Sequence, residues 1–150
     1  EDHVLDALRA EAAELDVLKV AIRPGKPLTV GRLGPALYVG LPGNPYAAAI
    51  TFSQIARPAL CRVAGLREVP DTWLPAVSGF TYRRTAGRQE YVPVTWTRRD
   101  ALGRPVLERL GRGASAALLP MARALGIAAI PPDLAVVHPG QPLPVEVLCG

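Results

Sequence analysis

Residues 19–45 read KVAIRPGKPLTVGRLGPALYVGLPGNP and carry most of the recognisable chemistry of this chain. An apolar run holds two cations, Lys19 and Arg23, and the turn Pro24-Gly25-Lys26-Pro27 follows it directly. Residues 28–31 and 36–40 are rich in apolar and β-branched side chains, so the sequence predicts a hairpin there. The stretch thus predicts a strand, a turn and a hairpin that together present positive charge.

The hairpin leads into a capped helix. In Leu41-Pro42-Gly43-Asn44-Pro45, Asn44 stands where an N-cap belongs and Pro45 occupies the first helical position, which tolerates proline. We expect the helix over about 45–60, with Pro58 bending or ending it. The free N–H groups at such a helix start can bind an anion, or the turn can be purely structural. The residues alone leave both interpretations open.

The residues before this stretch predict an α/β arrangement. Apolar positions at helical spacing predict a helix over 3–14, and the run at 17–22 predicts a buried strand. In that strand Lys19 and Arg23 share one face, about 13 Å apart at a rise of about 3.3 Å per residue. This spacing suits an extended anion, and it is equally compatible with a solvated strand face.

Beyond residue 64 the pattern changes to mostly β. We therefore predict residues 1–64 as part of an α/β domain, a linker over 65–72, and a small β-barrel or roll over 73–150. A helix is expected over 114–125. The predicted strands, of which the first three form a meander, cover 76–85, 89–97, 105–110, 127–130 and 144–148.

Composition excludes several classes of protein. The net charge of +4 comes without a basic stripe or interleaved aromatic residues, which argues against nucleic-acid binding. No signal peptide or membrane-length apolar run is present, and Cys61 and Cys149 cannot make a disulfide framework, so we expect a cytoplasmic protein. Because the chain opens on Glu1 and directly on a helix, we also expect a fragment of a longer protein.

The motifs together resemble a known family. KVAIRPGKPLTVG followed by GLPGNPYAAAITFSQIARPAL is similar to the molybdopterin molybdenumtransferases, the MoeA and gephyrin E-domain family. The resemblance covers the whole chain and corresponds to the C-terminal part of the family architecture. It implies a molybdopterin-binding α/β domain followed by a small C-terminal β-barrel, with a Gly-Gly-x-Ser-x-Gly-Asp stretch upstream of Glu1.

The resemblance also implies a function. Members of the family insert molybdate into adenylylated molybdopterin and release AMP with a requirement for Mg²⁺. It therefore implies a small anionic substrate, a homodimer when full length, and an inactive isolated fragment. Two alternatives stay open: a molybdopterin-binding or scaffold module without chemistry, and a general binder of polyanions.

Site residues follow from the resemblance position by position. It implies catalytic roles for Lys19, Arg23 and Lys26, with arginine at Arg23 replacing the usual lysine. It assigns metal binding to Asp2 and substrate binding to Gly25, Pro42, Gly43, Asn44, Arg88 and Ser115. The barrel departs from the family pattern, since Pro93-Val94 replaces Arg-Gly, Ala114 replaces glycine and Leu119-Pro120 replaces a serine pair.

Overall fold

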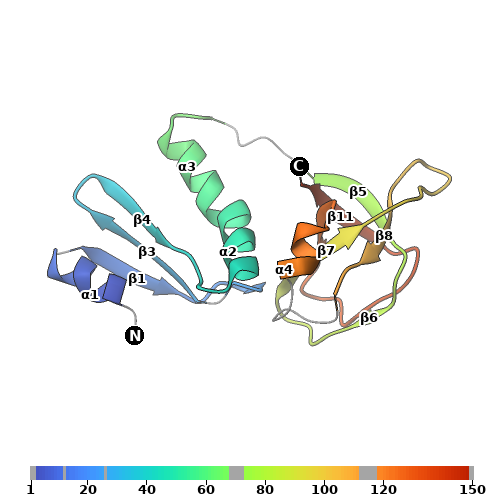
Figure 1. Cartoon of the computed structure of the whole chain (residues 1–150), viewed down its shortest axis with the longest axis horizontal. Helices are drawn as coiled ribbons and strands as arrows, with labels where there is room; N and C mark the ends of the chain where they lie inside the picture. The colour runs from blue at the N-terminus through green and yellow to red at the C-terminus, as the bar shows by residue number, and fades with distance from the viewer. Residues whose placement is uncertain (1–2, 12, 26, 68–72, 112–117, 149–150) are drawn as a thin grey trace.

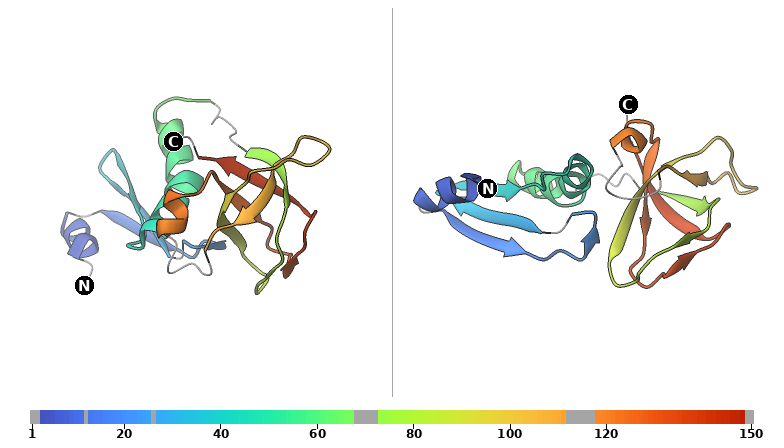
Figure 2. Two further views of the ribbon diagram at one scale, coloured as in Figure 1. Left: turned by 45° about the vertical axis from the view of Figure 1, so that its right-hand side comes forward. Right: turned by 60° about the horizontal axis from the view of Figure 1, so that its bottom comes forward.

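The computed structural model of the chain describes residues 3–11, 13–25, 27–67, 73–111 and 118–148. Two parts follow each other along the chain, which we call the N-terminal part (residues 3–67) and the barrel (residues 73–148). Figures 1 and 2 show them as adjacent lobes, with helix α2 on the side of the N-terminal part that faces the barrel.

The N-terminal part is built on a three-stranded antiparallel sheet. Its strand order is β1 (Glu14–Leu18), β3 (Leu28–Leu33) and β4 (Ala36–Gly40), and α1 (His3–Ala10) precedes it. Gly34 has a φ of 57° and supplies the left-handed position in the turn between β3 and β4. The predicted hairpin is therefore confirmed.

A continuous helical segment follows the hairpin in three pieces, α2 (Pro45–Thr51), the π-helical η1 (Phe52–Ala56) and α3 (Arg57–Val63). Of the two predicted effects of Pro58, ending the helix is wrong, since the helix runs on to Val63, and bending it stays a prediction. Pro58 falls in the first turn of α3, directly after the π-helical segment, in which the Arg57 N–H bonds the Phe52 carbonyl five residues back. The helix therefore accommodates the proline and continues for another turn.

Five strands close into a mixed barrel, in the order β7 (Gln89–Thr95), β8 (Val106–Arg109), β5 (Trp73–Ser78), β11 (Pro142–Val147) and β9 (Gly126–Ile130), which returns to β7. Strands β5 and β8 are parallel, and the other barrel pairs are antiparallel. A short pair, β6 (Tyr82–Arg83) with β10 (Val136–Val137), and the helix α4 (Leu118–Ala122) complete the described barrel. The predicted small barrel is confirmed.

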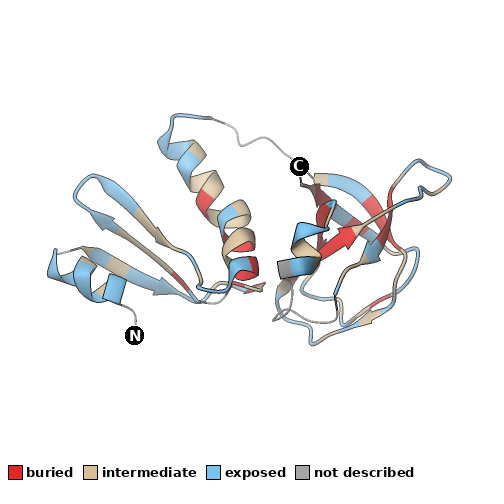
Figure 3. Ribbon diagram, in the orientation of Figure 1, coloured by how far each residue is buried: buried red, intermediate tan, exposed pale blue. Residues whose placement is uncertain are grey.

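The core has two clusters because β7 packs on both of its faces. Val92 and Val94 point into the barrel interior, which is the larger cluster. Tyr91, the residue before Val92, faces outward and packs with Tyr46 and Ile50 from α2. Figure 3 shows the buried residues concentrated in the barrel and on the part of the helix nearest to it. The N-terminal part thus packs against the outer face of the barrel.

The buried strand predicted over 17–22 is wrong. The strand begins earlier, at Glu14, and four of its five residues are exposed, because it is the edge strand of the open sheet and pairs only with β3. Residues 19–21 form no strand, so Lys19 and Arg23 do not share one strand face as predicted. The first helix ends at Ala10 rather than at residue 14.

The predicted meander is also wrong. The segment 76–85 divides into β5 and β6, and β5 pairs with β8 and β11 instead of with β7. Turn-forming residues mark where strands end, but they do not choose the partner of a strand across a barrel. Strands of the N-terminal sheet are antiparallel, and the expected α/β organisation is not confirmed. The domain limits at 64 and 73 stay a prediction.

Candidate anion-binding site at the junction

A two-residue strand joins the N-terminal part to the barrel. β2 (Ile22–Arg23) pairs in parallel with the start of β7, so that Arg23 lies opposite Glu90, and the Gln89 N–H donates to the Ala21 carbonyl over 3.0 Å. Residues in register on paired strands share a face of the sheet. The backbone therefore sets the predicted cation Arg23 beside a carboxylate of the barrel.

Glu90 is a buried carboxylate with donors on both of its oxygens. The side chain is 5% exposed, and the Tyr82 hydroxyl donates to Oε1 over 3.0 Å while Arg84 donates to Oε2 over 3.3 Å. The Nε of Arg23 lies 3.5 Å from Oε1, and this arginine keeps 41% of its side chain exposed. Burial of a carboxylate is tolerated here because it is paired and hydrogen-bonded.

Arg84 is held almost entirely by the protein. Its side chain is 1% exposed, and besides Glu90 it donates to the carbonyls of Leu134 (2.8 Å) and Pro131 (3.0 Å). These bonds satisfy its guanidinium inside the barrel, so Arg84 fixes Glu90 and does not face solvent. Of the two arginines that form ion pairs with Glu90, Arg23 is the one that an external ligand can reach directly.

Tyr82 carries another arginine above its ring. The guanidinium carbon of Arg109 lies 4.4 Å from the ring centroid, a cation–π contact. Burial, followed by the negative charge of Glu90 and the hydrogen bond to it, raises the pKa of the Tyr82 hydroxyl, whereas the cations Arg109 and Arg23 oppose the rise. Tyr82 therefore stays neutral, and its hydroxyl donates a hydrogen bond to Glu90.

A second buried carboxylate spans the junction. Glu146 on β11 accepts hydrogen bonds from the Ser53 hydroxyl (2.8 Å) and the Gln54 amide (2.7 Å), both in the π-helical segment η1. Tyr46 adds a hydrogen bond of 2.7 Å from its hydroxyl to the Tyr91 carbonyl. Side-chain contacts at Glu90, Glu146 and Tyr91 thus tie the N-terminal part to the barrel, in addition to the β2–β7 pairing.

The turn after Arg23 requires glycine. Gly25 has a φ of 134°, and a Cβ there would lie 2.7 Å from Ile22 Cδ1 and 2.9 Å from Thr51 Oγ1. Both the backbone angle and the space exclude a side chain. Thr51 is fully buried beneath this turn, and its hydroxyl has no hydrogen-bond partner among the described atoms.

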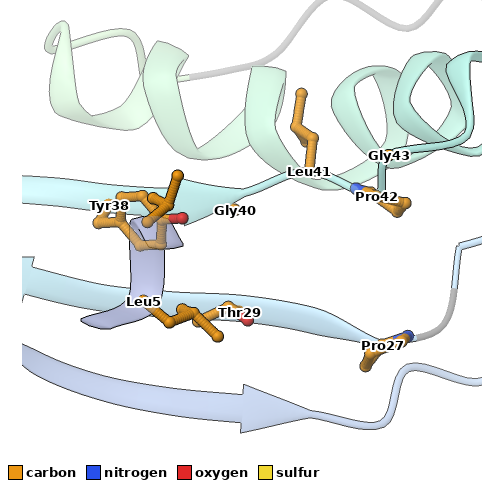
Figure 4. Close-up of a pocket in the computed structure, with 9 residues that line it drawn as sticks. Leu5, Pro27, Thr29, Tyr38, Gly40, Leu41, Pro42 and Gly43 are labelled. Atoms are coloured by element: carbon orange, nitrogen blue, oxygen red, sulfur yellow. The ribbon is translucent and has the colours of Figure 1, made fainter. Parts of the chain in front are cut away.

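The turn at residues 41–45 caps α2 and borders a pocket. The Asn44 side chain accepts from the Ala47 N–H over 3.1 Å, and Pro45 takes the first helical position, which confirms the predicted cap. A cavity of about 450 Å³ opens beside it, between α1, the hairpin and the turn (Figure 4). Its lining residues are Val4, Leu5, Pro27, Thr29, Tyr38, Gly40, Leu41, Pro42 and Gly43.

The structure separates the predicted site residues into two places. Pro42 and Gly43 line the pocket, whereas Arg23 lies at the barrel contact, with the exposed Arg88 directly before β7. Lys19 is exposed between β1 and β2. Gly25 and Asn44 occupy the two turns. The predicted residues Asp2, Lys26 and Ser115 lie outside the described residues.

The sequence did not reveal that Glu90 is the hydrogen-bond acceptor at this site. Glu90 had no evident partner in the sequence, because Tyr82 comes from β6, Arg84 is the residue after that strand, and Arg23 comes from the N-terminal part. The available signal was a charged residue at the start of an otherwise apolar strand, QEYVPVT. Within the described ranges, no group of three or more His, Cys, Asp or Glu side chains could hold a metal ion. Likewise, no described helix has the length and apolar character needed to cross a membrane.

Comparison with known proteins places these observations in context. The family described as the MoeA C-terminal region (domain IV) matches residues 75–148. A molybdopterin molybdenumtransferase of Haemophilus influenzae is 30% identical over 86 residues, which are 57% of this chain and 21% of that protein. Molybdopterin molybdenumtransferase 2 of Mycobacterium tuberculosis is 33% identical over 136 residues, 87% of this chain and 31% of that protein.

A solved structure extends the likeness to both parts of the chain. The crystal structure of the molybdopterin biosynthesis MoeA protein from Pyrococcus horikosii superposes with a TM-score of 0.71 at 24% identity, over 99% of this chain and 35% of that one. At this identity the likeness concerns the fold alone. The chain spans between 21% and 31% of the length of the two curated relatives named above.

Proposed function

We infer a function from one premise: this chain belongs to the MoeA family, whose curated members are molybdopterin molybdenumtransferases, and residues 75–148 correspond to the family's domain IV. We propose that the chain takes part in molybdenum cofactor biosynthesis, as a segment of an enzyme that inserts molybdate into adenylylated molybdopterin and releases AMP. The observation that carries the proposal is the family match together with the 33% identity over 136 residues.

Charges at the junction support this chemistry. A substrate with a pyrophosphate link and an incoming oxyanion repel each other, and cations lower the cost of bringing them together. Arg23 supplies such a cation, since its side chain is 41% exposed and its Nε lies 3.5 Å from Glu90 Oε1. Lys19, exposed between β1 and β2, is a second candidate cation outside the junction.

Binding and positioning are the roles that the described residues can perform. The dithiolene of molybdopterin supplies the metal bonding, and the protein supplies orientation and electrostatic field. Mg²⁺ is implied by the family, but the described residues form no carboxylate cluster for it. We therefore assign no step to the metal.

A chimera tests the proposal. This chain would replace the matching C-terminal segment of the H. influenzae relative, and AMP release from adenylylated molybdopterin in the presence of molybdate would be measured. We expect turnover, and we expect the double variant Lys19→Ala, Arg23→Ala to lose at least about tenfold in kcat/KM, as for the loss of charged hydrogen bonds. The variant Arg98→Ala, which removes an exposed arginine elsewhere on the barrel, is the matched control.

The outcomes separate the candidate functions. Substrate binding without AMP release favours a molybdopterin-binding module, which the replacement of the family's Arg-Gly by Pro93-Val94 would explain. Unchanged turnover in the double variant contradicts the site assignment. Equal binding of unrelated polyanions, lost at moderate salt, would indicate a general anion binder. Sedimentation of the chimera tests the homodimer that the family resemblance implies.

A further inference from the structure

The pairing of β7 sets two arginines along the same strand edge. Strand β9 pairs with β7 over the whole run from Glu90 to Val94 and therefore occupies one edge of it. The other edge takes β2 at Gln89 and Glu90, and β8 at Val94 and Thr95. Two segments that are remote in sequence thus lie one after the other beside β7.

Register also sets the two arginines on the same face. Arg23 lies opposite Glu90, and Arg109 lies opposite Val94. Since Glu90 and Val94 are an even number of residues apart, both pairs face the barrel interior. Glu90 and Val94 are four residues apart, which corresponds to about 13 Å along the strand. Two arginine side chains that extend toward each other can bridge this distance. We call this end of the barrel, with Arg23, Tyr82, Glu90 and Arg109, the barrel mouth.

The barrel mouth has more positive than negative charge. Among the described ion pairs of this region, Glu90 is the carboxylate, and it pairs with both Arg23 and the buried Arg84. Glu108 is next to Arg109 in sequence, but it is exposed and alternation along β8 turns it to the other face. No described carboxylate forms an ion pair with Arg109. Two guanidinium groups therefore share one carboxylate, and Arg109 adds a third positive charge over Tyr82.

Both accessible arginines are held in ways that leave donors free. Arg109 lies over the Tyr82 ring, and no described hydrogen bond uses its N–H groups. Arg23 approaches Glu90 through Nε, which leaves its two terminal nitrogens without a described partner. Tyr82 connects the two, because its ring lies beneath Arg109 and its hydroxyl binds Glu90.

We propose that Arg109 acts with Arg23 to bind one tetrahedral oxyanion at the barrel mouth, while Glu90 and Tyr82 hold the two guanidinium groups in place. The inference rests on the proposed function only in its use of Arg23, and it adds Arg109 as a binding residue contributed by the barrel. Two planar guanidinium groups favour an anion with several oxygens, such as molybdate or a phosphate group.

Calorimetric titration of the 150-residue chain tests the proposal. Sodium molybdate and inorganic phosphate are titrated separately at low ionic strength, and the tighter of the two identifies the source of the oxyanion. Arg109→Gln and Arg23→Gln should each raise the dissociation constant about tenfold, the loss typical of one charged hydrogen-bonding group. Arg98→Gln makes the same change of charge at the far end of β8, where Arg98 accepts from the Val106 N–H, and should leave the constant unchanged.

Thermal melting of each variant shows whether it is folded, and Arg109→Lys provides a second substitution that keeps the charge but not the planar fork. We expect Arg109→Lys to bind with intermediate affinity. The proposal is overturned if the wild-type chain binds neither oxyanion, if Arg109→Gln and Arg109→Lys bind as tightly as wild type, or if Arg98→Gln weakens binding equally. A loss with Arg23→Gln and none with Arg109→Gln overturns this inference and leaves the proposed function standing. The chimera turnover tests the proposed function independently.

Discussion

The two parts of the molecule bury their strands to very different extents. Every residue of the barrel strand β9 is buried, whereas four of the five residues of β1 in the N-terminal sheet are exposed. A closed barrel pairs both edges of each strand and fills its interior with side chains. An open three-stranded sheet leaves faces and edges accessible. The barrel therefore supplies its own core, and the N-terminal part does not.

The N-terminal part compensates by packing against the barrel. Its largest buried side chains include Tyr46 and Ile50, and both belong to the cluster that contains Tyr91 of β7. Polar contacts to Glu90 and Glu146 lie on the same junction. Contacts with the barrel thus stabilise the N-terminal part, and the candidate site lies among these contacts.

The largest effect is expected when one leucine in each part is replaced by alanine, because the two leucines differ in burial. Leu107 in β8 is fully buried, and Leu18 in β1 is 45% exposed. We expect Leu107→Ala to lower the free energy of unfolding by about 2–5 kcal/mol, because it leaves a cavity. Leu18→Ala should cost less than about 0.5 kcal/mol. Urea denaturation followed by circular dichroism measures both, and equal losses would contradict the contrast.

A smaller effect is expected at the junction and depends on pH. Burial, then the charges of Glu90 and Tyr82, raises the pKa of the Tyr46 hydroxyl above its ordinary value near 10. A raised pKa in the folded state stabilises the fold below the unfolded value and loses this contribution as pH rises above it. Wild type should therefore lose stability relative to Tyr46→Phe by about 1.4 kcal/mol per pH unit above pH 10.

Unfolding free energies of wild type and Tyr46→Phe, measured at several pH values between 9 and 11, check this expectation. Near pH 8 the variant should be less stable by about 1 kcal/mol, because it lacks the hydrogen bond to the Tyr91 carbonyl. The difference in unfolding free energy between wild type and Tyr46→Phe should then narrow as the pH rises. Parallel pH curves for the two proteins would show that Tyr46 does not titrate with unfolding.

The smallest effect is expected for Asn44 in the turn before α2, where two substitutions distinguish a capping role from substrate binding. Asn44→Ala removes the acceptor for the Ala47 N–H and should cost about 1 kcal/mol of stability. Asn44→Ser keeps a capping oxygen and should stay within about 0.5 kcal/mol of wild type. If Asn44 also binds substrate, Asn44→Ser weakens binding of adenylylated molybdopterin while thermal stability is retained. Retained binding in this variant would leave Asn44 with the capping role alone.

The features that were predicted correctly are those that depend on residues close together in the sequence. The hairpin over Leu28–Gly40 and the Asn44 cap need only neighbouring residues, and both are confirmed. The strand Val106–Arg109 and its antiparallel pairing with β7 also agree with prediction. Burial of residues 17–22 could not be predicted, since it depends on what packs over the strand. The partners of β5 are remote in sequence and were predicted wrongly.

The candidate site shows the same division. Arg23 is recognisable in the sequence as a cation beside a turn, but its partner Glu90 lies 67 positions further along the chain (90 − 23) and comes from the other part. Arg109 showed no sign of function in the sequence. Its place beside Arg23 depends on β2 and β8 using the same edge of β7. Such a juxtaposition has no local signature, because strand pairing in a barrel joins distant segments.

By itself, the sequence determined the turns, the capped helix, the small barrel and the resemblance to the MoeA family, because these depend on residue types at fixed short spacings. Tertiary structure alone decided which charges meet. Parallel pairing of Arg23 with Glu90 and burial of Arg84 leave the barrel mouth with two accessible guanidinium groups. The physical reason is that hydrogen-bonded register places side chains in space, whereas the sequence specifies only their order.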